Sequence, residues 1–257
     1  MSRLLKALPL ALAIAALSTF AASCGSSSPA QVRFVHVIQD AGPLDIDVSG
    51  ANVTTTQEFT DIPFLGVLPN QPGYTSTPSG SDTITGFSTG TTTEVFSDSL
   101  NLGSGAQYTL VATGFSLTGT NGSNVALLQI SDNIPVPPAG DVEFRVIHAS
   151  PSGPDGQGGA VDVYIELNPN NGPGPPITIS NLPYTQASKY VSFAYNPNNA
   201  TNPPGFTVYV TAAGSKIPII SEPINPGTAG AVRTLVLTDV QGGTLMSSSF
   251  LELNDLN

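Results

Sequence analysis

The chain has 257 residues, enough for one large domain or two ordinary ones, and its 40% hydrophobic content is typical of packed cores and not of a disordered chain. Only 10% of the residues are charged, and acidic residues outnumber basic ones by 18 to seven. Because nucleic-acid binding depends on Lys and Arg, this balance excludes nucleic acid as a partner. The 26 Gly and 23 Pro supply turns at short intervals and favour many short strands.

Residues 1–23 are predicted to form a secretory signal peptide. Two basic residues, Arg3 and Lys6, precede an apolar stretch over residues 7–20, and three small residues stand directly before Cys24. The apolar stretch is shorter than the about 20 residues that span a bilayer, so we expect a cleaved leader. Its removal leaves five basic against 18 acidic residues, a net charge of −13.

Cys24 is the only cysteine of the chain. At this position it resembles the lipid-attachment cysteine of bacterial lipoproteins, which implies a diacylglycerol on the thiol and an acyl chain on the freed amine. The alternative is ordinary cleavage, because Ala21 stands where lipoprotein signals usually carry Leu and the triplet also suits the general signal peptidase. We expect lipidation, export and attachment to the cell envelope. Gly25 is compatible with the outer membrane where a bacterium has two membranes.

Residues 24–30 are predicted to be a flexible polar tether, because they are rich in Gly and Ser. With a single cysteine the chain forms no internal disulfide, so its stability must come from its hydrophobic cores.

The rest of the sequence repeats itself once. Residues 32–36 (Val-Arg-Phe-Val-His) are echoed by residues 144–148 (Phe-Arg-Val-Ile-His), with the Arg and His pairs both 112 residues apart. Further matches follow in the same order: residues 44–48 with 161–165, 62–64 with 182–184, 109–111 with 234–236, and 130–132 with 253–255. We therefore predict two related domains, 31–133 and 141–257, joined by a short, semi-rigid Pro-rich linker over 134–140.

Alternating apolar residues predict strands in both repeats. Val32, Phe34, His36 and Ile38 share one face of a half-buried strand, and a second strand places Asp45 and Asp47 opposite its apolar face. Further candidates are residues 83–87, 93–96, 108–115, 125–130, 190–195, 206–211, 217–221, 232–238 and 245–251. About seven strands per repeat predict an all-β fold, two tandem immunoglobulin-like, antiparallel β-sandwiches after the signal peptide.

Residues 145–151 (Arg-Val-Ile-His-Ala-Ser-Pro) and 160–164 (Ala-Val-Asp-Val-Tyr) resemble the opening of the bacterial domain of unknown function 4397. The resemblance continues through residues 179–184 and covers the second repeat nearly end to end. The first repeat is a weaker copy, because Val-Ile-Gln-Asp follows His36 in place of Ala-Ser-Pro. The family often occurs as tandem copies in exported proteins, so the resemblance implies fold and location but carries over no site.

The two histidines, His36 and His148, occupy the same place in the two repeats. Catalysis or metal ligation is one interpretation, and we favour a structural one in which a neutral imidazole bonds a turn backbone. Residues 86–90 match the nucleophile-elbow pattern G-x-S-x-G at Ser88, but the segment is a predicted strand with no helix after it, so we expect no catalysis there.

Acidic residues near predicted turns are candidates for calcium binding, but their spacing lacks the successive ligands of known calcium loops. They are Asp40, Asp45, Asp47, Asp141, Glu143, Asp155 and Asp162. Glycan binding usually needs aromatic platforms, and there is no Trp, which leaves Tyr74, Tyr184, Tyr190 and Tyr195. The Asn- and Pro-rich loops over residues 168–176 and 196–204 are long enough to form a binding surface.

The sequence thus favours a non-enzymatic structural or protein-interaction module of the cell envelope, with no catalytic residue, metal or cofactor. The expected partners are a membrane, reached through the lipid at Cys24, and a protein or glycan. The alternative function is a ligand-binding module for glycan or calcium, and a hydrolase-type enzyme comes third.

Overall fold

The computed structural model describes residues 28–53, 57–116, 124–167, 173, 178–196, 205–240 and 248–256. The predicted signal peptide, Cys24 and nearly all of the two long loops lie outside the described residues. Apart from one short 3-10 helix, η1 (Gly153–Asp155), every described element is a strand, which confirms the all-β prediction. The described segments contain no helix with the length and hydropathy that a membrane crossing requires.

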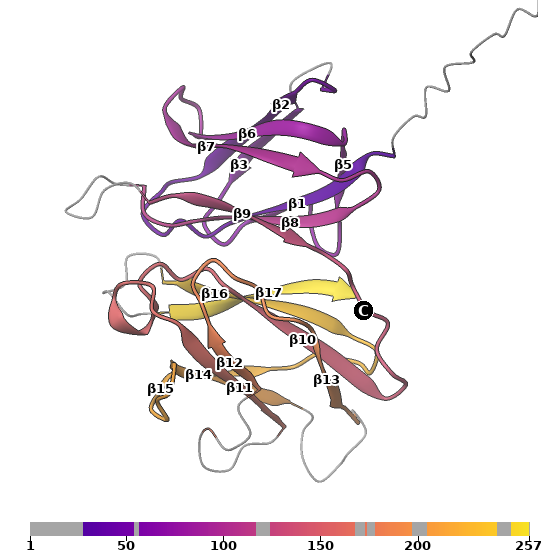
Figure 1. The fold of residues 1–257 in the computed structure, drawn as a ribbon, viewed down its shortest axis with the longest axis vertical. Helices are drawn as coiled ribbons and strands as arrows, with labels where there is room; N and C mark the ends of the chain where they lie inside the picture. Colours follow the sequence, from indigo (N-terminus) through magenta and orange to yellow (C-terminus); the bar gives the residue numbers. More distant parts are fainter. Residues whose placement is uncertain are drawn as a thin grey trace, which may run out of the picture.

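The strands β1 to β9 form what we call the N-terminal half. Its inner sheet has the order β4-β1-β8-β9, with β5 also paired to β1, and its outer sheet has the order β3-β2-β6-β7. The two sheets lie face to face in Figure 1 as a sandwich. The strands are β1 (Ala30–His36), β2 (Leu44–Gly50), β3 (Gln57–Ile62), β4 (Val67–Leu68), β5 (Thr75–Thr77), β6 (Gly80–Ser88), β7 (Glu94–Leu102), β8 (Gln107–Thr113) and β9 (Ala126–Ser131).

The strands β10 to β17 form the C-terminal half with a corresponding order. The inner sheet is β13-β10-β16-β17 and the outer sheet is β12-β11-β14-β15. The strands are β10 (Asp141–His148), β11 (Val161–Leu167), β12 (Ile179–Leu182), β13 (Val191–Ala194), β14 (Phe206–Ala212), β15 (Pro218–Ile224), β16 (Val232–Asp239) and β17 (Ser248–Leu256).

Each half has a hydrophobic core between its own two sheets. In the N-terminal half, Phe34 and Leu110 from the inner sheet pack with Ile84 from the outer sheet. In the C-terminal half, Phe144 of the inner sheet packs edge-on against Phe206 of the outer sheet, with 5.1 Å between ring centroids. The strand alternation correctly placed Phe34 on the same face as Val32 and Ile38, which lie in this core with it.

A third core joins the two inner sheets to each other. Val35 and Val111 of the N-terminal half pack with Ile147, Val236 and Leu253 of the C-terminal half. The four sheets therefore stack as four layers (Figure 1). The half-buried character predicted for β1 and β10 is wrong, because each is covered on one face by its own outer sheet and on the other by the second half.

Each inner sheet contains one parallel pair, which the antiparallel prediction did not include. Residues 31–36 of β1 pair in parallel with residues 107–112 of β8, and β10 pairs in the same way with β16. Parallel neighbours need a crossover connection, and here the strands of the outer sheet provide it. The N-terminal half has nine described strands and the C-terminal half eight, against about seven expected in each. β4 and β5, too brief to show alternation, are the two additional strands of the N-terminal half.

Candidate functional site

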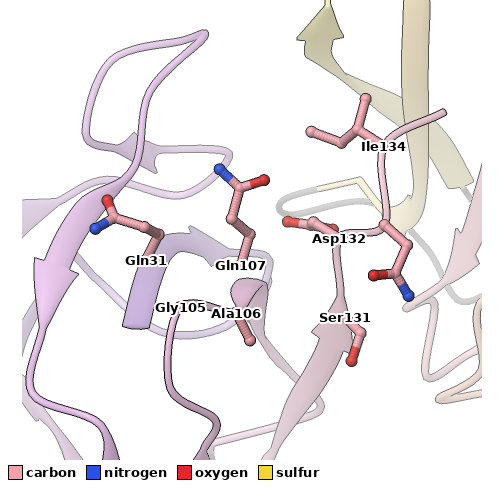
Figure 2. Close-up of a pocket in the computed structure, with 8 residues that line it drawn as sticks. Gln31, Gly105, Ala106, Gln107, Ser131, Asp132 and Ile134 are labelled. Carbon is pink, nitrogen blue, oxygen red and sulfur yellow. The ribbon is translucent and has the colours of Figure 1, made fainter. Parts of the chain in front are cut away.

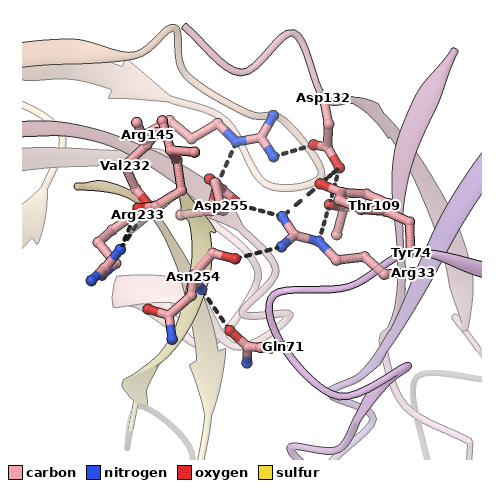
Figure 3. Close-up of polar contacts among 12 residues, drawn as sticks. Arg33, Gln71, Tyr74, Thr109, Asp132, Arg145, Val232, Arg233, Asn254 and Asp255 are labelled. Carbon is pink, nitrogen blue, oxygen red and sulfur yellow. Dashed lines mark hydrogen bonds and ion pairs between the residues drawn. The ribbon is translucent and has the colours of Figure 1, made fainter. Parts of the chain in front are cut away.

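Four buried charged side chains meet between the two inner sheets (Figure 3). Arg33 Nη2 lies 2.5 Å from Asp255 Oδ1 and 3.8 Å from Asp132 Oδ2, and Arg145 Nη2 pairs with Asp132 Oδ1. Their side chains are at most 3% exposed. We call these four residues the interface ion cluster. Each arginine pairs with an aspartate of the opposite half, so the cluster ties the halves together.

Hydroxyl groups complete the cluster on the N-terminal side. Arg33 Nε donates to Thr109 Oγ1 at 2.7 Å, and the Thr109 hydroxyl donates to Asp132 Oδ2 at 2.6 Å. The Tyr74 hydroxyl also donates to Asp132 Oδ2, at 2.8 Å, and its ring centroid lies 5.1 Å from the Arg33 guanidinium. Burial raises the pKa of Tyr74 above its usual value, so the hydroxyl stays protonated and continues to donate.

The C-terminal half repeats this arrangement. Arg145 Nε donates to Thr234 Oγ1 at 2.7 Å, and the Thr234 hydroxyl donates to Asp255 Oδ2 at 2.5 Å. The Tyr190 hydroxyl donates to Asp255 at 2.9 Å, and its ring centroid lies 4.8 Å from the Arg145 guanidinium. Burial alone would lower the pKa of Arg145, but the Asp132 carboxylate and its neighbours raise it above its usual value. The guanidinium is therefore charged in the folded protein.

Side chains of the N-terminal half also bond the backbone of the C-terminal half. Arg33 Nη1 donates to the Asn254 carbonyl at 3.4 Å, and the Gln71 side-chain oxygen accepts the Asn254 amide at 2.5 Å. The donors and acceptors of the interface ion cluster are thus occupied by one another and shielded from solvent. Such an arrangement clamps the two surfaces together, because the buried polar groups satisfy one another.

The interface ion cluster was not predicted from the sequence, although a signal was present. Arg33 and Arg145 interrupt apolar strands at matching positions, and Asp132 and Asp255 end matching segments. A charge in the middle of a buried strand must be paired, because an isolated buried charge is very costly. Two such arginines and two such aspartates in a chain with few charges indicate a shared ion-pair site.

The two histidines bond turn backbones, as the structural interpretation predicted. His36 Nδ1 accepts the Ile38 amide at 3.2 Å, so Nε2 carries the proton and donates to the Gly42 carbonyl at 3.1 Å. His148 makes the corresponding contacts with the Ser150 amide, at 3.4 Å, and the Gly159 carbonyl, at 3.1 Å. Burial lowers the pKa of His36 to about 4, which keeps the ring neutral near pH 7.

Asp45 and Asp162 hold turns at matching positions of the two outer sheets. Asp45 accepts the amides of Asp61 and Gly90, at 2.8 and 3.0 Å, and these bonds lower its pKa. Asp162 accepts the amides of Asn181 and Gly214, at 2.7 and 2.8 Å. Both Asp61 and Asn181 have a positive φ, 57° and 51°, so the carboxylates stabilise an unfavourable backbone conformation.

The other acidic candidates do not converge on one point. Asp40 accepts the Ser116 amide at 2.8 Å, and Asp141 accepts the Ser192 hydroxyl at 2.8 Å. Burial raises the pKa of Glu143. The described part of the chain contains no group of three or more His, Cys, Asp or Glu side chains that could hold a metal ion.

Asp82 is a further buried carboxylate, which the sequence analysis did not single out. It is 1% exposed, and neither of its oxygens has a hydrogen-bond partner among the described residues. Burial raises its pKa above the usual value, so the carboxyl binds a proton more readily than an exposed aspartate does.

Ser88 ends β6 and enters a tight turn to β7, as expected of a hairpin rather than a nucleophile elbow. Its amide donates to the Thr93 carbonyl and its carbonyl accepts the Thr91 amide, both at 3.0 Å. Gly86 lies against the Phe96 ring, where an added Cβ would approach to 2.3 Å. The glycine of the motif is therefore explained by close packing.

The four tyrosine candidates are occupied in internal packing. Tyr74 and Tyr190 cover the interface ion cluster. Tyr184 meets the His148 ring edge-on, with centroids 5.7 Å apart, and Tyr195 stacks on Phe206 at 5.9 Å.

Shallow hollows remain on the surface. One of 440 Å³ lies beside the start of β1 and β8, lined by Gln31, Gln107 and residues 105–106 and 131–134. Figure 2 shows Gln31 and Gln107 on one side and Asp132 and Ile134 on the other. A second, of 260 Å³, lies where the two halves meet, lined by Phe64, Leu65, Thr238, Asp239, Val240, Ser249 and Phe250.

A family model described as Domain of unknown function (DUF4397) matches residues 30–164, from the start of β1 to Tyr164 in β11. No curated protein matches the chain. One similar solved structure is the Bacillus anthracis TIE protein, with 10% identity and a TM-score of 0.24, covering 83% of this chain and 34% of that one. The chain thus spans about a third of the length of that protein.

A second solved structure is a putative adhesin from Bacteroides ovatus, with 9% identity and a TM-score of 0.23, covering 86% of this chain and 92% of that one. The family match covers more than half of the chain and includes both the Arg33–His36 and the Arg145–His148 segments. The chain belongs to the DUF4397 family.

Proposed function

We propose that this chain is an exported lipoprotein with a non-enzymatic structural or protein-interaction role in the cell envelope. The observation that carries the proposal is the clamp between the two inner sheets. The charged and hydroxyl groups that could perform chemistry bond one another across it, and a third core surrounds them. A protein built in this way is a rigid body that can hold an outer surface at a defined distance from its attachment point.

The N-terminal sequence supports the location. A basic start, a short apolar stretch and three small residues before Cys24 provide for export and lipid attachment, and outer-membrane placement follows where two membranes exist. The matching strand orders support a second proposal, that the C-terminal half is a further copy of the family domain. Nucleic acid is not a partner of so acidic a chain.

Lipidation is tested by expressing the full chain in a bacterium and separating membrane from soluble protein. We expect the mature protein in the membrane fraction, with a diacylglyceryl and an acyl group on Cys24 by mass spectrometry. Cys24→Ala should move it to the soluble fraction, whereas Ser23→Ala, which keeps a small residue before the cysteine, should not. Membrane retention of Cys24→Ala would contradict the proposal.

The absence of a small ligand is tested on residues 30–257 by thermal unfolding with calcium, a chelator and soluble glycans. A ligand that binds only the folded state raises the melting temperature. We expect no change. A reproducible rise with calcium that the chelator reverses, or with one glycan, would replace the proposal with a ligand-binding module.

A further inference from the structure

Residue Ser28, close to the proposed lipid site, is fixed to the folded body. Its carbonyl accepts the Gly105 amide at 3.2 Å and the Ser104 hydroxyl at 3.1 Å, both from the turn between β7 and β8. Three residues stand between Cys24 and Ser28, and the four steps from one Cα to the other reach at most about 14 Å at full extension. A lipid on Cys24 would therefore hold this part of the body close to the headgroups.

Three chain segments meet at one hollow of the surface. They are residues 28–32, 103–107 and 133–140, and we call their combined surface the tether surface. The Gln31 amide donates to the Ala106 carbonyl and the Asp132 amide to the Gln107 carbonyl, both at 2.8 Å, which holds the segments side by side. All three line the hollow of Figure 2. In Figure 1, β1 begins on the same side of the molecule as the connection from β9 to β10.

The three segments of the tether surface are uncharged and include an apolar tip, and Asp132 and Asp141 stand on either side of the third segment. The three segments contain no Asp, Glu, Lys or Arg, although the mature chain carries 18 acidic residues. Val136 is 88% exposed, the highest value among the exposed large hydrophobic residues that the structure describes. Pro135, Pro137 and Pro138 flank it. Proline has no backbone N–H, so this segment brings fewer unsatisfied donors into a lipid interface than an ordinary loop would.

The opposite end of the molecule, in contrast, carries acidic side chains. The strand β1 spans roughly 20 Å from the tether surface to His36. Beyond its far end lie Asp40, Asp45 and Asp61 of the N-terminal half, all at least partly exposed. Carboxylates are repelled by anionic headgroups within about one Debye length, so this end is unsuited to lie against lipid.

We propose that the tether surface rests on the lipid headgroups, with Val136 as its most deeply inserted side chain. This inference rests on the proposed lipid attachment at Cys24 and adds to it a defined orientation. The short tether brings the tether surface to the membrane, the apolar tip gains by leaving water, and the acidic end points outward. A partner protein would then meet the acidic end and not the tether surface.

The chain has no Trp, so one introduced Trp reports its own environment without background. We would place the lipidated full chain carrying Val136→Trp in phosphatidylcholine vesicles with and without brominated acyl chains. The matched control is Ile217→Trp, because Ile217 is 76% exposed and lies beside the start of β11, at the end of the C-terminal half remote from residue 140. Ala139→Trp provides a second reporter on the tether surface.

We expect a blue-shifted emission that brominated lipid quenches for Val136→Trp, and neither effect for Ile217→Trp. If the protein sediments with the vesicles but brominated lipid quenches neither Trp, or quenches both equally, the proposed orientation is wrong. The lipid attachment stands in that case. If the protein does not sediment and Cys24 carries no lipid, the proposed function fails and this inference fails with it.

Discussion

An arginine in the middle of a buried strand needs partners for its whole guanidinium group. Arg33 and Arg145 meet this requirement with a carboxylate, a threonine hydroxyl, a backbone carbonyl and a tyrosine ring each. Replacing a buried ion pair with apolar side chains is often neutral or stabilising, so such a pair is weak evidence of stability by itself. The interface ion cluster instead restricts how the two inner sheets align, because each arginine must meet an aspartate of the other half.

Removing one member of the interface ion cluster should be costly. Arg145→Met removes the nearer cation from buried Asp132 and leaves Arg33 at 3.8 Å, so we expect the free energy of unfolding to fall by about 3 to 5 kcal/mol in urea titrations. Lys216→Met, at an exposed site, should change it by less than about 0.5 kcal/mol. A loss below about 1 kcal/mol for Arg145→Met would show that Asp132 is satisfied without Arg145.

His36 makes stability depend on pH. Its pKa is about 4 in the folded protein against 6.5 for a free imidazole, so the unfolded chain binds the extra proton first. Stability should therefore fall as the pH drops from about 6.5 to about 4, by roughly 3 kcal/mol from this residue. His36→Gln keeps a donor for Gly42 and should remove that part of the slope. An unchanged slope in urea titrations across this range would contradict the assignment.

At the scale of the strands, the most informative residues are the aspartates of β2 and β11. The sequence placed Asp45 and Asp47 together on the outer face of one strand. The structure separates their roles, because Asp45 bonds two turn amides and the Thr89 hydroxyl, whereas Asp47 has no hydrogen bond from its side chain within the described residues. The first aspartate of each strand, Asp45 in β2 and Asp162 in β11, thus holds neighbouring turns in place.

The two aspartates provide a matched pair of variants. Asp45→Ala should destabilise the protein by about 1 to 3 kcal/mol and speed amide hydrogen exchange at Asp61 and Gly90, because both amides lose their acceptor. Asp47→Ala should leave exchange at these amides unchanged. Equal protection of the Asp61 amide in the two variants would contradict the role given to Asp45.

Most strands could be predicted from local alternation, because one face of each strand meets a core. The parallel pairing of β1 with β8 could not, since the partners are 76 residues apart and nothing local encodes direction. The interface ion cluster was visible in the sequence only as an arginine and an aspartate at matching positions of each repeat. Its members come from four places in the chain, and their meeting depends on how one half packs on the other.

The whole molecule is organised by a nearly self-complementary interface. Arg33 pairs with Asp255 and Arg145 with Asp132, and matching residues of both halves contribute to the third core. Reciprocal contacts of this kind are the rule for two identical subunits related by a twofold axis. Each half therefore presents a surface that fits another copy of itself.

The interface predicts the behaviour of residues 141–257 expressed alone. The fragment keeps the core of the C-terminal half but exposes Ile147, Val236 and Leu253, so we expect it to fold and to form a dimer with Arg145 facing Asp255 of the second copy. Light scattering after gel filtration measures the mass. Arg145→Glu should yield monomers, since two carboxylates would then meet. A monomeric unsubstituted fragment would refute the idea of self-complementarity.

The parallel pairing of β1 with β8 has a mechanical consequence. A force that pulls on the N-terminal segment, away from the rest of the body, acts along β1. The six residue pairs between β1 and β8 then resist sliding together, and β4 and β5 hold the other edge of the same strand. Hydrogen bonds that are loaded in shear along a strand must break nearly at once. The hydrogen bonds of a hairpin that is pulled open from its end break one after another. A pull on the N-terminal segment would therefore have to break the pairing on both edges of β1.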